Sequence, residues 1–161
     1  MGRLALSRLQ LGSLIACVVL LVSAAVAVAA TLGQTGFYKG PTSQGKNFTF
    51  RLVQNGRKIE NGFFRWTGDC NVAGRGALSV RSAYSDSVSS TGRFRAAGQY
   101  RERLGNSPYD AKHTLRSAGR FVSERRATGT FRGRTTVIDR ATGQVIDQCD
   151  SGPVTWTVRH R

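Results

Sequence analysis

Apolar and polar side chains alternate along most of the chain from residue 36 to the C-terminus. In the run 93–101, for example, Phe94 and Tyr100 share one parity with small residues, while arginines occupy the other parity. A period of two indicates β-strands with one buried face, and no stretch after residue 30 repeats its apolar residues with the 3.6-residue period of a helix. The pattern predicts an all-β domain of about eight to ten short strands.

The turn signals between these runs predict short links and therefore an antiparallel meander. Asn55-Gly56 predicts a two-residue hairpin turn, Asn61-Gly62 a second turn, and residues 140–143 a third. Residues 71–76 and 104–109 read as irregular loops. The expected fold is a single up-and-down β-barrel, with a β-sandwich as the alternative.

Glycine and alanine recur at the inward parity of the expected strands. The positions are Ala96, Gly98, Gly119, Gly129 and Gly133. Small residues beside inward aromatics suit a curved sheet, where the backbone approaches its neighbours closely. They leave two alternatives open, which are a cavity for a small ligand and tight packing of the interior.

The first 30 residues have the pattern of an export signal. Arg3 and Arg8 precede an uncharged segment that ends in small residues at 27–30. This arrangement predicts an N-terminal signal helix over 1–30, cleaved after Ala29 or Ala30, and an exported domain over 31–161 that is secreted or associated with the cell envelope. An uncleaved anchor is one alternative, because the apolar run is long enough to span a bilayer. A lipobox at Cys17 is another, although too few apolar residues precede it.

The composition after cleavage is strongly basic. Without Arg3 and Arg8, the chain keeps 22 of its 24 Lys and Arg residues against 9 Asp and Glu, a net charge of about +13. Eight arginines fall on the outward parity of expected strands and are candidates for anion binding: Arg93, Arg95, Arg101, Arg116, Arg120, Arg132, Arg134 and Arg159. Such a surface attracts anionic envelope polymers or lipid headgroups. Outward strand positions also need polar residues for solubility alone.

Two cysteines, Cys70 and Cys149, remain after cleavage. In an oxidising compartment an even pair predicts one disulfide, which would close a loop of about 80 residues and stabilise the fold by about 4 kcal/mol. The alternatives are a metal site or a reactive thiol. A metal site would need more ligands, and His113 and His160 are the only histidines.

Catalytic patterns are hard to find in this sequence. His113 falls on the inward parity of a strand, as core histidines do, and His160 lies next to the C-terminus. Asp139, Asp147 and Asp150 cluster in the chain, and a glycosidase uses such a pair of carboxylates, but turn formation and local pairing with the many arginines are the favoured explanation. We expect no catalytic residue, no metal and no cofactor.

The opening Gly36-Phe37-Tyr38-Lys39-Gly40-Pro41-Thr42-Ser43-Gln44-Gly45 resembles that of small secreted, uncharacterised β proteins of actinomycetes. The resemblance continues in order through the strand 48–52, the turn at 55–59, the strand 64–70 and the closing segment 149–156. It implies an extracellular β fold and pairing of the two cysteines, and it implies no activity.

These observations predict a non-enzymatic exported module whose basic face touches anionic cell-surface or wall polymers. Nucleic acid is not the expected partner, because most aromatics take the inward parity and an exported protein meets little of it. A small-ligand carrier with a barrel cavity is the alternative from another class. An enzyme or inhibitor is the third and least favoured reading.

Overall fold

The computed structural model describes residues 31–161, so the expected signal helix over 1–30 lies outside the described residues. The described part contains nine strands and no helix. The strands are β1 (Gly36–Pro41), β2 (Asn47–Val53), β3 (Lys58–Cys70), β4 (Gly74–Ser87), β5 (Arg93–Arg103), β6 (Tyr109–Ser123), β7 (Arg126–Asp139), β8 (Val145–Asp150) and β9 (Val154–His160). Between residues 31 and 161 there is accordingly no helix of the length and apolar character needed to cross a membrane.

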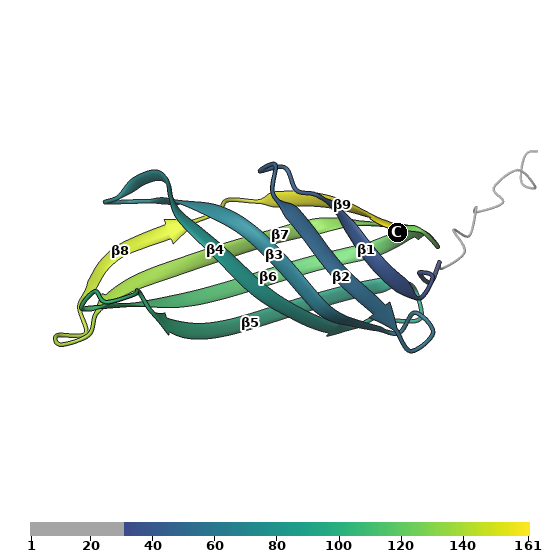
Figure 1. Ribbon diagram of the computed structural model, residues 1–161, viewed down its shortest axis with the longest axis horizontal. Coiled ribbons are helices and arrows are strands. Elements are labelled where there is room, and N and C mark those ends of the chain that lie inside the picture. The colour runs from purple at the N-terminus through teal and green to yellow at the C-terminus, as the bar shows by residue number, and fades with distance from the viewer. Residues whose placement is uncertain (1–30) are drawn as a thin grey trace, which may run out of the picture.

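All nine strands belong to one antiparallel sheet with the order β4-β3-β2-β1-β9-β7-β6-β5. The short strand β8 lies off this path and pairs with both β3 and β7. Figure 1 shows β2, β3 and β4 in front of β5, β6 and β7, with the two sets of strands crossing at an angle. The strands β1 and β9 join the two layers through their pairing. The prediction of an all-β antiparallel fold is confirmed.

The alternating pattern puts an aromatic core between the two layers. Phe48 stacks on Phe64 with ring centroids 3.8 Å apart, and Phe64 stacks in turn on Phe131 of the opposite layer at 4.7 Å. Trp156 from β9 meets the edge of Phe48 at 4.8 Å. Packed aromatic pairs of this kind contribute about 0.5–1.5 kcal/mol each beyond the burial of their area. The sheet therefore curls around a continuous row of rings.

The turn expected at Asn61-Gly62 is wrong, because both residues lie inside β3. Asn61 has a φ of 51°, and the register of β3 against β2 and β4 shifts at this point. The extra residue forms a β-bulge, which bends the strand around the core. A Cβ on Gly62 would lie only 2.6 Å from the Tyr84 ring, so the glycine allows the close approach.

The turn at Asn55-Gly56 is present but longer than expected. Val53 pairs with Lys58, so four residues rather than two make the connection. Gln54, Asn55 and Gly56 all have positive φ values, between 51° and 84°. Asn and Gly adopt this left-handed conformation at the lowest cost, which explains why the signal was visible in the sequence.

Several strands are longer than the sequence suggested, and the loops between them are shorter. β4 begins at Gly74, inside the segment read as a loop over 71–76, and β6 begins at Tyr109, the last residue of the loop expected over 104–109. The strands β3, β4, β6 and β7 each have 13 to 15 residues. Long strands give the sheet a broad outer surface on which the polar residues are displayed.

Candidate functional site

The two cysteines form the predicted disulfide. Cys70 at the end of β3 faces Cys149 of β8, and their sulfurs are 2.02 Å apart. The bond joins strands that pair at only two positions, so it fastens β8 to the front layer. A disulfide is compatible with an extracellular location.

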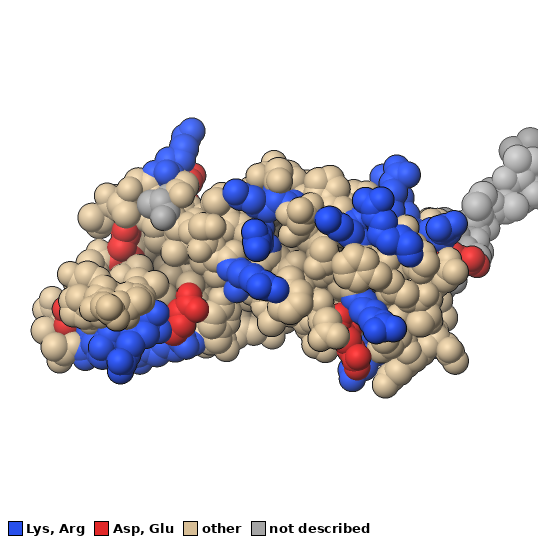
Figure 2. Space-filling model, in the orientation of Figure 1, with Lys and Arg blue, Asp and Glu red and all other residues tan. Residues whose placement is uncertain are grey.

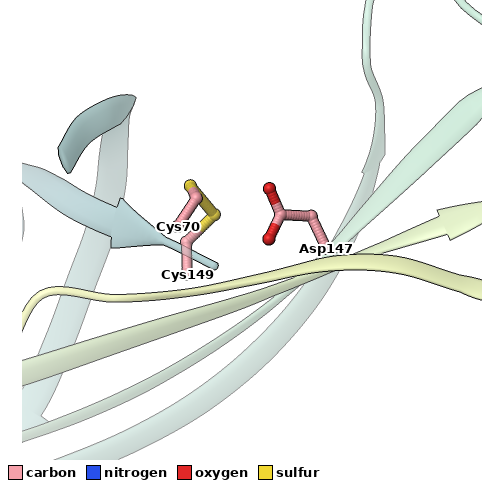
Figure 3. Close-up of side chains that lie close together, drawn as sticks. All are labelled: Cys70, Asp147 and Cys149. Carbon is pink, nitrogen blue, oxygen red and sulfur yellow. A yellow bond between two sulfur atoms is a disulfide. The ribbon is translucent and has the colours of Figure 1, made fainter. Parts of the chain in front are cut away.

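Asp147 lies beside this disulfide, and its carboxylate is directed toward the sulfurs (Figure 3). Cys70, Asp147 and Cys149 are the one group of metal-ligand residues that come together within residues 31–161. Both sulfurs are bonded to each other, and the Asp147 oxygens accept the backbone N–H groups of Val72 and Ala73 at 3.0 Å. These hydrogen bonds, the one from Ala73 first, hold the pKa of Asp147 below its usual value. The group therefore secures the β3–β4 turn.

Asp139, Asp147 and Asp150, which cluster in the sequence, each make a different set of contacts in the structure. Asp139 accepts backbone N–H groups from Ala141 and Thr142 in the turn, both at 2.9 Å, and these bonds lower its pKa. Asp150 pairs with arginines of β7 instead. Asp139 and Asp147 thus bind backbone N–H groups of turns and Asp150 binds arginine, which agrees with their predicted role in turns and local pairing.

His113 is completely buried, as its parity predicted. Its Nδ1 lies 2.7 Å from the Thr135 hydroxyl and its Nε2 lies 2.9 Å from a Glu102 oxygen. The Tyr100 ring stacks on the imidazole with a centroid separation of 4.6 Å. This order of hydroxyl, imidazole and carboxylate resembles a hydrolase triad, but Thr135 is only 1% exposed and has no access to a substrate.

Sequence reasoning missed Glu102 and Thr135 as the partners of His113. Both residues lie on the inward parity of their strands, and a charged residue at an inward position such as Glu102 is the signal that could have found them. A buried histidine with two hydrogen-bonded ring nitrogens is a satisfied core residue. This cluster fixes the end of the edge strand β5 to β6 and β7.

The interior offers little space for a ligand. A Cβ on Gly119 would lie 2.6 Å from the rings of Phe94 and Trp156, and a Cβ on Gly133 would lie 2.6 Å from Trp66. Gly129 is equally crowded by Trp156. Gly119, Gly129 and Gly133 therefore make room for aromatic rings, which favours tight packing at these three positions, whereas no atom lies within 4 Å of the place where a Cβ on Gly98 would stand.

One small slot remains between the edge strands β4 and β5. It measures about 90 Å³ and is lined by Tyr84 and Ser85 on one side and by Ala96 and Gly98 on the other. Ligand pockets for small organic molecules occupy about 300–1,000 Å³. Burial raises the pKa of the Tyr84 phenol above its usual value, so this lining group stays neutral.

All eight arginines that were predicted to point outward are exposed. Seven of them lie on three neighbouring strands, with Arg93, Arg95 and Arg101 in β5, Arg116 and Arg120 in β6, and Arg132 and Arg134 in β7. Eight outward basic residues of these strands form what we call the arginine face, which leaves out Arg103 at the end of β5 and Arg126 at the start of β7: Arg93, Arg95, Arg101, Lys112, Arg116, Arg120, Arg132 and Arg134. Arg159 lies in β9 instead, where it pairs in register with Arg126 and Lys39.

The sheet register places like charges of the arginine face directly opposite each other. Arg93 pairs with Arg120, Arg116 with Arg132, and Arg101 with Lys112. Like charges at such positions destabilise a sheet, whereas opposite charges would contribute about 0.2–1 kcal/mol per pair. Sequence reasoning missed Lys112, since only the register shows that it faces Arg101.

Acids neutralise one part of the arginine face and leave another part free. Asp150 accepts hydrogen bonds from Arg132 at 2.7 Å and from Arg134 at 2.9 Å, and these arginines lower the pKa of Asp150 to about 2. Arg101 pairs with Asp110 at 2.9 Å. Within residues 31–161, the side chains of Arg93, Arg95, Arg116 and Arg120 have no acidic partner.

Two shallow depressions of the arginine face are bordered by several arginines, and a third, of about 270 Å³, lies between β5 and β6 with Arg116 as its one arginine. The first depression, of about 250 Å³, is bordered by Arg93, Arg95 and Arg120 together with Thr128 and Thr130.

The second depression, of about 170 Å³, is lined by Thr114, Arg116, Arg132 and Arg134. Guanidinium groups and hydroxyls are the donors that hold tetrahedral oxyanions and carboxylates in proteins.

Basic residues also occur on the opposite layer. Figure 2 shows that Lys and Arg outnumber Asp and Glu on the face toward the viewer, where they form separate groups. Arg65 and Arg81 pair in register there, and the Arg81 guanidinium lies 4.4 Å from the ring centroid of the exposed Phe63. The excess of positive charge is thus general, whereas the unpaired row on β5 and β6 belongs to the arginine face.

Comparison with protein-family models, with curated proteins and with solved structures gives no significant match for this chain. The resemblance to secreted actinomycete proteins therefore stays a prediction from the sequence.

Proposed function

We propose that this protein is an exported, non-enzymatic β module that binds anionic cell-surface or wall polymers through the arginine face. The observation that carries the proposal is the register of β5, β6 and β7, which sets Arg93 against Arg120 and Arg116 against Arg132. Of these four side chains only Arg132 has an acidic partner within residues 31–161, which is Asp150. If these residues served solubility alone, opposite charges at the paired positions would make the sheet more stable. A bound polyanion would remove the repulsion and use the guanidinium groups as bidentate donors.

Aromatic positions argue against nucleic acid bases as the ligand. Single-stranded nucleic acid binding combines basic grooves with exposed aromatic rings on which the bases stack. The exposed phenylalanines of the described chain, Phe37 and Phe63, lie in β1 and β3, away from the arginine face. This face therefore suits recognition of charge along a polymer backbone.

A carrier function receives less support than surface binding. The slot between β4 and β5 is about 90 Å³, well below the volume that a small organic ligand needs. An enzymatic function would require an accessible reactive group, and the buried Thr135 beside His113 does not supply one. Neither alternative has an observation that favours it.

We also propose that the curled sheet is an open barrel with a seam between β4 and β5. Support comes from the side chains that bridge these two edge strands. The Trp66 indole donates to Ser82 at 3.2 Å, and the Ser82 hydroxyl lies 3.3 Å from the Tyr100 hydroxyl. Export through a cleaved signal at 1–30 completes the proposal and is supported by the disulfide.

The test compares salt elution of the exported protein from phosphocellulose with that of a variant in which four unpaired arginines are replaced by alanine. These are Arg93, Arg95, Arg116 and Arg120. Each lost phosphate contact is expected to reduce the slope of log K against log salt by about 0.7, so the variant should show a slope shallower by about 3.

A control variant of equal charge carries alanine at Arg51, Arg57, Arg65 and Arg75. These residues are exposed and lie outside β5, β6 and β7. The control should keep most of the original slope. If both variants lose retention equally, binding follows net charge alone and the arginine face is not a site.

A further inference from the structure

The two depressions of the arginine face lie one behind the other along β6 and β7. In β6, Arg120 borders the first depression and Arg116 lines the second. Four residues of a strand span about 13 Å, so the two sets of donors are separated by about this distance. The outward residue of β6 between these two arginines is Ala118, whose small side chain lines the first depression on the side of the second.

The first depression is bordered by hydrogen-bond donors whose side chains have no acceptor side chain within residues 31–161. Arg93, Arg95 and Arg120 surround it, and the hydroxyls of Thr128 and Thr130 make no side-chain hydrogen bond to any residue between 31 and 161. Three guanidinium groups and two hydroxyls exceed what the two oxygens of one carboxylate can accept. A phosphodiester group has two non-bridging oxygens and two ester oxygens around a tetrahedral phosphorus, so donors that approach from several sides can all reach an acceptor.

The second depression carries the same chemistry in a partly neutralised form. The Arg116 side chain has no acidic partner between residues 31 and 161, while Arg132 and Arg134 hold the Asp150 carboxylate. Asp150 occupies the position that an external anion would take beside these guanidinium groups. The second depression should therefore bind a single anion less tightly than the first. It contributes to affinity when another part of the same ligand is already bound at the first depression.

On the basis of the proposed function, we propose that the ligand of the arginine face is a linear phosphodiester polymer that places one phosphate in each depression. The segment of the polymer between these two phosphates crosses the surface at Ala118. Anchoring at the first depression raises the effective concentration of the next phosphates at the second, which can strengthen binding by a factor of about 10²–10⁴ without new contacts.

A membrane surface also presents phosphodiesters, but proteins that lie on bilayers add apolar or aromatic anchors to their basic residues. Among the large hydrophobic residues of the described chain that are exposed, only Val122 belongs to β5, β6 or β7. The structure therefore favours an extended polymer over a lipid surface. A sulfated polysaccharide has the same charge but a different linker, and the test separates it.

The experiment titrates the exported protein with glycerol phosphate oligomers of increasing length and follows binding by calorimetry. Monomers should bind weakly, and affinity should rise by at least about tenfold once an oligomer spans both depressions, then level off. Arg120→Ala and Arg116→Ala should each abolish this step, whereas Arg65→Ala in the front layer should preserve it. Asp150→Asn removes the competing carboxylate and should strengthen oligomer binding by up to about fivefold.

Three results would overturn the inference. They are a smooth rise of affinity with length, equal binding of a sulfated polysaccharide of the same charge, and tighter binding to phosphatidylglycerol vesicles than to the oligomers. Retention on phosphocellulose that depends on the arginine face but shows no length step would refute the two-site inference and leave the proposed function standing. Absence of that retention would refute both.

Discussion

Two inward-parity glycines that look alike in the sequence should respond in opposite ways to the same substitution. Gly119 of β6 lies under the buried rings of Phe94 and Trp156, whereas Gly98 of β5 has no atom within 4 Å of the place where a Cβ would stand. The perturbation is a single methyl group at each position. Both residues lack a positive φ, so alanine brings no backbone strain at either site.

The magnitude follows from the distances. A Cβ at position 119 would lie 2.6 Å from three ring carbons, which is 0.8 Å short of the 3.4 Å at which ordinary contact begins. The rings are held by further aromatic neighbours, among them Phe50 and Phe121 around Phe94. Overpacking of a filled core costs about 1–3 kcal/mol, and we expect Gly119→Ala to fall near about 2 kcal/mol. Gly98→Ala should be neutral or stabilise by about 0.4–1 kcal/mol, because alanine restricts the unfolded chain.

Urea unfolding followed by circular dichroism measures both effects. With a slope of about 1–3 kcal/mol per molar urea, Gly119→Ala should lower the midpoint by about 1 M and leave the slope unchanged. The Gly98→Ala midpoint should stay the same or rise. The reasoning is refuted if both variants shift the midpoint equally, since the glycines would then serve backbone flexibility rather than ring packing.

Three further predictions concern the disulfide, an ion pair and the buried histidine. Replacing Cys70 and Cys149 together by serine should lower the free energy of unfolding by about 2–4 kcal/mol, because the bond closes a loop with a sequence separation of 79, and an unchanged unfolding midpoint would contradict this. Asp150 has a pKa of about 2 in the folded protein against about 3.9 when unfolded, so its stabilisation is complete above about pH 4 and is lost as the pH falls toward 2. Its side chain is 35% exposed, so we expect a loss of about 1 kcal/mol, absent in Asp150→Asn, in urea titrations across that range. Thr135→Val leaves a ring nitrogen of His113 without its partner and should destabilise by about 1–3 kcal/mol, and thermal unfolding at the wild-type temperature would count against that hydrogen bond.

The alternation of residues correctly assigned most side chains to the inside or the outside. It placed Phe94 and His113 in the interior and the eight candidate arginines on the surface. Parity works because successive side chains of a strand point to opposite faces whatever the strand pairs with. The Asn61-Gly62 pair was a false turn signal, since a residue with positive φ serves a bulge as well as a turn.

The local pattern of apolar and polar residues could not show which strands pair with each other. The insertion of β9 between β1 and β7, and the double pairing of β8, join segments that are far apart in the sequence. The same holds for the contact of His113 with Glu102 and Thr135, which needs three strands in one register.

The sequence by itself determined that residues 36–160 form antiparallel strands with aromatics inward and arginines outward, and it identified the two cysteines as a pair. The tertiary structure was needed to show which arginines face each other, which of them acids neutralise, and that rings fill the space beside Gly119, Gly129 and Gly133. The physical reason is that the direction of a side chain is a local property of the strand, whereas charge neighbours and packing depend on the register between strands.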